Sequence, residues 1–151
     1  MKSVIAKMAV VVASLSFLAG ISAAADAPIA TPAKNKHNMV IQLSEDSEKV
    51  ANLALNNAIN VQKEVGMDNI NIEVVAYGPG LKMMLKDSPV AQRIKDLAVQ
   101  GVAFSACGNT IKKWEKDNNA KAEITEGARV VPAGLVRILN LQEQGWSYVR
   151  P

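Results

Sequence analysis

The sequence has few of the residues that cross-link a small domain or bind a metal. Its 151 residues include one cysteine, Cys107, and one histidine, His37. One cysteine cannot form an intramolecular disulfide, so burial of apolar side chains must stabilise the fold. One histidine and one cysteine cannot supply the four ligands of a structural zinc site. We therefore expect no bound metal, and nothing in the sequence calls for a cofactor.

The N-terminal residues have the features of a secretory signal peptide, which we place at residues 1–25. Lys2 and Lys7 precede an apolar stretch at 8–21, and small residues follow up to Ala25. The apolar stretch of about 14 residues is shorter than the ~20 that span a bilayer, so we expect cleavage rather than anchoring. The protein is thus predicted to be exported, to the periplasm or beyond the cell.

A strong excess of charge is also missing from the predicted mature chain. The whole chain has 17 basic and 14 acidic residues, and cleavage removes Lys2 and Lys7 but no acid, which leaves 15 against 14. A nearly neutral protein without a basic stripe is poorly suited to bind nucleic acid or an anionic membrane. We expect neither as a partner.

The rest of the chain predicts a short leader and one domain. Residues 26–37 contain two prolines among alanines and predict a flexible leader. Residues 38–151 suit a single domain, in which apolar runs alternate with segments of helical periodicity. The apolar runs are continuous, which indicates that both faces of the sheet are covered. The sequence therefore predicts an α/β fold, a three-layer α/β/α sandwich with a mainly parallel sheet of about five strands.

The predicted strands and helices alternate along the chain. Strands are expected at 39–43, 70–77, 102–106, 128–131 and 146–149, and helices at about 46–65, 81–85, 88–100, 109–118 and 135–144.

In two of these helices, the spacing of apolar residues predicts which face packs against the core. The core face of the helix at 46–65 is expected to consist of Val50, Leu53, Ala54, Ala58, Val61 and Val65. Leu55 and Ile59 fall off that face and would contact either the rest of the domain or another subunit. In the helix at 135–144, the side chains expected to face inward are Leu135, Ile138, Leu139 and Leu141.

The carboxyl ends of parallel strands form the edge of a sheet at which ligands usually bind. The segments expected at this edge are 44–46, 78–80, 107–109 and 132–134. Cys107 thus lies at the functional edge and at the start of a helix, where unpaired N–H groups and the helix dipole favour the thiolate. Gly108 is expected to leave room for an attacking group. The alternatives are that Glu45 and Asp46 disfavour the thiolate, or that Cys107 is a small buried residue ending a strand.

The histidine and the glycine-containing turn after the second strand are two other candidate parts of a site. His37 precedes the first strand, so about 17 Å separates it from the edge that holds Cys107, and a Cys–His catalytic pair is not expected. The turn formed by Tyr77, Gly78, Pro79 and Gly80 lacks the Walker lysine and the full dinucleotide glycine spacing. We interpret Tyr77 and the backbone of this turn as one wall of the site.

Four segments stand out by their order and spacing: VVAYGPGL at 74–81, VAFSACGNT at 102–110, VPAG at 131–134 and GWSY at 145–148. Together they resemble the DsrE/DsrF-like family, in its exported small-protein branch. The resemblance implies an α/β sandwich that assembles into homotrimers or homohexamers. In the best understood relatives it also implies a cysteine after the third strand that carries sulfur as a persulfide, and Cys107 matches that position.

Two functions of different kinds remain open. In the first, the Cys107 thiolate accepts sulfane sulfur from a donor protein or small sulfur compound and passes it to an acceptor, without a metal or a general base. Any enzymatic activity would then be sulfur transfer. In the second, the protein is a non-enzymatic oligomeric scaffold or small-ligand-binding protein, and Cys107 is packed. The binding residues expected in either case are Tyr77, Gly78, Gly80, Gly108 and Asn109.

Overall fold

The computed structural model describes residues 36–151. These residues form an α/β domain around one five-stranded sheet with the strand order β4-β3-β2-β1-β5. The strands are β1 (His37–Leu43), β2 (Ile70–Ala76), β3 (Val102–Cys107), β4 (Ala128–Val131) and β5 (Ser147–Val149). Each neighbouring pair is parallel. The predicted signal peptide and nearly all of the predicted leader lie outside the described residues.

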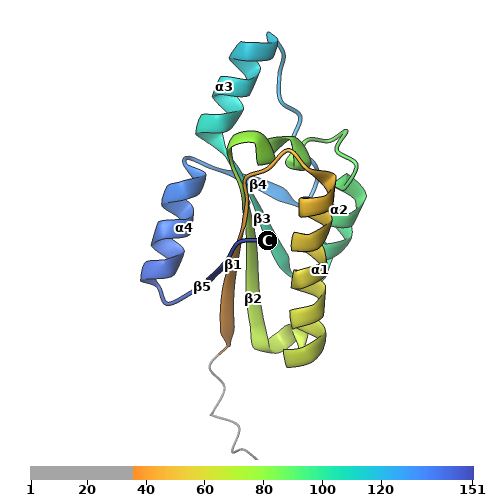
Figure 1. Cartoon of the computed structure of the whole chain (residues 1–151), viewed down its shortest axis with the longest axis vertical. Coiled ribbons are helices and arrows are strands. Elements are labelled where there is room, and N and C mark those ends of the chain that lie inside the picture. The colour runs from red at the N-terminus through yellow and green to blue at the C-terminus, as the bar shows by residue number, and fades with distance from the viewer. Residues whose placement is uncertain (1–35) are drawn as a thin grey trace, which may run out of the picture. The chain divides into compact units, whose positions relative to one another are not determined.

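The helices lie on both faces of the sheet, so the predicted three-layer α/β fold is confirmed (Figure 1). They are α1 (Glu48–Val65), α2 (Ala91–Val99), α3 (Gly108–Asn118) and α4 (Gly134–Glu143), with 3₁₀ helices η1 (Met67–Asn69) and η2 (Gly78–Met84). In Figure 1, α1 and α2 cover one face, α4 covers the other, and α3 continues beyond the end of β3.

The two faces bury different amounts of apolar surface. The strand residues Ile41, Val74 and Phe104 belong to a large apolar cluster with α1, α2 and η2. The opposite face has a small cluster, in which Val40 and Val75 meet Ile138 and Leu141 of α4. The layer formed by α4 is therefore held by fewer apolar contacts than the layer formed by α1 and α2.

The first strand begins earlier than predicted. His37 pairs with Ile70 and Asn38 with Asn71, and the Asn71 side-chain amide donates a hydrogen bond of 2.8 Å to Asn38 Oδ1. The last residue of the predicted leader is thus the first residue of β1. Polar side chains at this exposed end of the strand concealed it, because strand prediction depended on a continuous apolar run.

The predicted core face of α1 was partly wrong. Leu53 is 46 % exposed, whereas Leu55, predicted to lie off that face, is buried. The buried residues are Ala51, Ala54, Leu55, Ala58 and Gln62. Three alanines on this stripe bring the helix backbone close to the sheet, and the Gln62 side chain is accommodated by a hydrogen bond to the Gln100 carbonyl at 3.1 Å.

The predicted core face of α4 also needs correction. Ile138 and Leu141 are buried as expected, but Leu135 and Leu139 are 62 % and 54 % exposed. The inward position that an apolar pattern would give to a leucine is occupied by Arg137, because Arg137 has a buried carboxylate partner on the sheet.

Candidate functional site

Cys107 is the last residue of β3 and the N-cap residue of α3, so it lies at the carboxyl edge of the sheet as predicted. Its exposed fraction is 6 %. The thiol is therefore a nearly covered group at a strand-to-helix junction, and its reactivity depends on the few groups around it.

Hydrogen-bond donors from two helices surround the sulfur. The Thr110 hydroxyl, together with the backbone N–H groups of Thr110 and Asn109, comes from the first turn of α3, and the Gly134 N–H comes from the start of α4. Burial raises the pKa of the Cys107 thiol, but these hydrogen bonds outweigh burial and hold the pKa below its ordinary value. The thiolate is thus favoured by neutral donors at two helix N-termini.

Thr110 connects the thiol to the turn after β2. The Gly78 N–H donates to Thr110 Oγ1 at 3.1 Å, which leaves the hydroxyl hydrogen for the sulfur. Gly78 has a φ of 54°, a left-handed conformation that glycine adopts without strain. Gly78 therefore acts on the site through Thr110. Sequence reasoning missed Thr110, which lies three residues after the N-cap residue Cys107, where a side chain can reach back to the start of the helix.

Gly108 and Gly134 allow the chain to pass closely around the thiol. A Cβ on Gly108 would lie 3.1 Å from the Val131 carbonyl oxygen, so the space beside Gly108 is filled by the loop between β4 and α4. The prediction that Gly108 leaves room for an attacking group was therefore wrong. A Cβ on Gly134 would lie 3.1 Å from the Cβ atoms of both Cys107 and Tyr77. The start of α4 thus rests directly on Cys107, and Tyr77 lines the same place.

The two remaining predicted binding residues, Asn109 and Gly80, lie in different surroundings. The Asn109 side chain is exposed. The backbone N–H of Asn109 also donates to the Pro132 carbonyl at 3.2 Å, which connects α3 to the loop before α4. Gly80 is buried against the end of β1, because a Cβ there would lie 2.2 Å from the Leu43 carbonyl oxygen. Gly80 is therefore explained by backbone packing, whereas the other four predicted binding residues lie close to the thiol.

The charged residues at this edge and the histidine do not assemble with Cys107. Asp46 forms a salt bridge with Lys82, and Glu45 one with Arg150. The strand register places His37 beside Ile70 at the amino ends of β1 and β2, far along the sheet from Cys107, as predicted.

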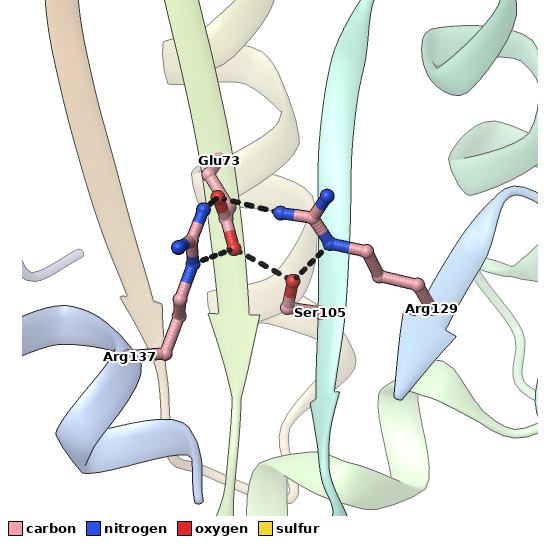
Figure 2. Close-up of polar contacts among 4 residues, drawn as sticks. All are labelled: Glu73, Ser105, Arg129 and Arg137. Atoms are coloured by element: carbon pink, nitrogen blue, oxygen red, sulfur yellow. Dashed lines mark hydrogen bonds and ion pairs between the residues drawn. The ribbon is translucent and has the colours of Figure 1, made fainter. Parts of the chain in front are cut away.

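A buried charged network lies on the α4 face of the sheet and was missed from the sequence (Figure 2). Glu73 of β2 is 1 % exposed. Arg137 of α4 donates to both of its oxygens, from Nε at 2.9 Å and from Nη2 at 2.7 Å. Ser105 Oγ donates to Glu73 Oε1 at 2.6 Å, and Arg129 Nη2 of β4 donates to Oε2 at 3.0 Å. Arg129 Nε also donates to Ser105 Oγ at 3.2 Å.

This network keeps Glu73 ionised. Burial raises the pKa of the Glu73 carboxyl, but hydrogen bonds from Arg137 and Ser105 and the charges of Arg137 and Arg129 outweigh it, so the pKa lies below its ordinary value. Ser105 is two residues before Cys107 on the same strand, so both side chains point to the same face of the sheet. The available sequence signal was a glutamate inside the apolar run Ile-Glu-Val-Val at 72–75.

Within residues 36–151 there is no group of three or more histidine, cysteine, aspartate or glutamate side chains able to hold a metal ion. Nor does that part contain a helix whose length and apolar content would allow it to cross a membrane.

Comparison with known proteins places this arrangement in a family. The model of the DsrE/DsrF-like family matches residues 37–151. The chain is similar to a protein of unknown function from Methanobacterium thermoautotrophicum, MTH1491, with 33 % sequence identity and a TM-score of 0.69. That match covers 77 % of this chain and 100 % of the other. None of the curated proteins matches the chain.

Proposed function

The chain belongs to the DsrE/DsrF-like family, and from this premise we propose that it is a sulfur carrier in which Cys107 holds the sulfur as a persulfide. The observation that supports the proposal is the set of donors around the thiol, which come from two helix N-termini and lower its pKa. A sulfur carrier needs a thiolate at neutral pH, and here no histidine base is required to produce it.

The proposed chemistry is a pair of exchange steps at sulfur. The Cys107 thiolate attacks the outer sulfur of a donor such as thiosulfate. A new S–S bond forms at Sγ, the donor's own S–S bond breaks, and its electron pair leaves with sulfite. An acceptor thiolate then attacks the outer sulfur of the persulfide, and the Cys107 thiolate departs. A lowered thiol pKa assists this departure, because a more stable thiolate is a better leaving group.

The proposal extends to partners and place of action. We propose that the protein assembles with further copies of itself, as a homotrimer or homohexamer, and exchanges sulfur with a small sulfur compound or a donor or acceptor protein. We also propose that it works after export, with residues 1–25 removed. These proposals rest on the family resemblance and on the signal-like composition of the N-terminus.

Sulfur uptake by the intact protein tests the function. Purified protein is incubated with thiosulfate or polysulfide and weighed by intact mass spectrometry. We expect a gain of one or two sulfur atoms that a reducing thiol removes, and no gain in Cys107→Ser. An unchanged mass together with slow alkylation of Cys107 would contradict the carrier. It would favour a non-enzymatic scaffold or binding protein, for which the 6 % exposure of Cys107 is the supporting observation.

A further inference from the structure

The attachment of α4 to the sheet depends on a charged contact as well as on apolar packing. The larger buried side chains of α4 are Ile138 and Leu141, which join the small apolar cluster on this face. Between them and the start of the helix lies Arg137, whose guanidinium makes two hydrogen bonds to the buried carboxylate of Glu73. A two-bonded contact of this kind fixes direction as well as distance.

The same helical turn contacts the thiol. Gly134 and Arg137 are three residues apart, so both lie on the face of α4 that is turned to the sheet. Gly134 rests on Cys107, Tyr77 and Val75, and its N–H is one of the groups that lower the pKa of the Cys107 thiol. Any displacement of this turn that lengthens the contact between Arg137 and Glu73 also moves the Gly134 N–H away from the thiol.

The carboxylate is itself fixed from three directions. Glu73 lies on β2, the central strand, and it also accepts hydrogen bonds from Ser105 of β3 and Arg129 of β4. Figure 2 shows the four side chains converging on the face that α4 covers. The strands at the centre of the sheet thus fix the position of the carboxylate. Because Arg137 binds this carboxylate, the position of α4 depends on it.

We propose that Glu73 is a positioning residue for the site: through Arg137 it holds the first turn of α4 over Cys107, so that the Gly134 N–H points at the thiol sulfur. The inference deepens the proposed function and rests on it for its purpose. The thiol contact can nevertheless be measured whether or not the protein carries sulfur. Two kinds of contact thus have different roles. The ion pair between Glu73 and Arg137 sets the position of α4, and the neutral donors stabilise the thiolate.

A simple charge effect makes the opposite prediction for one substitution. In Glu73→Gln a negative charge is lost while both arginines remain, so through-space electrostatics alone would lower the pKa of the Cys107 thiol. If Glu73 positions α4, the loss of the two-bonded contact lets the helix start move, and the thiol loses a donor. The positioning model therefore predicts that the thiol pKa rises, by roughly one unit.

The experiment measures the rate of iodoacetamide alkylation of Cys107 against pH in the full-length protein. We expect a raised thiol pKa in Glu73→Gln and, to about half that extent, in Arg137→Lys, which keeps the charge but loses the planar fork. Arg129→Lys is the matched control, because it makes the same change at the same carboxylate from β4. Because Arg129 lies on β4 and not on α4, we expect a smaller rise in its thiol pKa than in Arg137→Lys. Circular dichroism shows which variants are folded.

The outcomes separate the models. A fall or no change in the thiol pKa of folded Glu73→Gln would overturn the proposal. If Glu73→Gln does not fold, the two lysine variants decide, and equal thiol pKa values in Arg137→Lys and the wild type would overturn it. A raised thiol pKa in a protein that takes up no sulfur would support the positioning role and remove the sulfur-carrier function.

Discussion

The Cys107 thiol differs from a cysteine activated by a neighbouring base. Its donors are three backbone N–H groups and one hydroxyl, none of which carries a full charge. Such donors do not titrate near neutral pH, so the thiolate population is governed by the thiol alone. The fraction of reactive thiolate should therefore follow one ionisation over the working range of pH.

Thr110→Val should raise the pKa of the Cys107 thiol by about one unit, because the hydroxyl is the leading hydrogen-bond donor that opposes burial. At a pH below the thiol pKa, alkylation should slow about tenfold, since each pKa unit changes the thiolate fraction tenfold. The pH dependence of the alkylation rate measures this. Thr110→Ser keeps the hydroxyl and should behave as the wild type, and an unshifted Thr110→Val would contradict the role of the hydroxyl.

At the scale of elements, the first turn of η2 contains two glycines that are required for different reasons. Gly78 has open space where a Cβ would lie but has a positive φ, whereas a Cβ on Gly80 would collide with the Leu43 backbone. The first requirement is conformational, and the second is a close approach of η2 to the end of β1.

Gly80→Ala should therefore lower the free energy of unfolding by about 3 kcal/mol, because a backbone carbonyl cannot move aside as a flexible side chain can. Gly78→Asn is the matched control and should cost less than about 1 kcal/mol, since asparagine tolerates the left-handed conformation. Urea denaturation measures both. Equal losses in the two variants would show that Gly80 has no special packing role.

The sequence predicted the elements well because their signals are local. Periodicity and turn residues located β2, β4 and α3 within about two residues. The end of an apolar run was enough to place the lone cysteine at the carboxyl edge of the sheet. The buried network could not be predicted, because Glu73, Ser105, Arg129 and Arg137 meet only once strand order and register are known. The core face of α4 was predicted wrongly for the same reason, because an arginine is expected to face solvent unless its buried partner is known.

At the scale of the whole molecule, the outer face of α4 is unusually apolar for a surface. Leu135, Val136 and Leu139 are 62 %, 52 % and 54 % exposed. Spacings of three and four residues put them side by side on the helix, so they form one stripe. The family resemblance implies homotrimers or homohexamers, and a second copy of the chain is the partner we propose for this stripe. The covered helix would be the one whose first turn contacts Cys107.

Leu139→Glu should then weaken the assembly, because it places a charge in the stripe beside Leu135 and Val136, where burial against another copy would remove its water. Size-exclusion chromatography with light scattering should give a trimer or hexamer for the wild type and smaller species for Leu139→Glu at the same concentration. Val99→Glu is the matched control, because Val99 is 90 % exposed at the end of α2 and should leave the mass unchanged. A monomeric wild type, or an unchanged mass of Leu139→Glu, would contradict this interface.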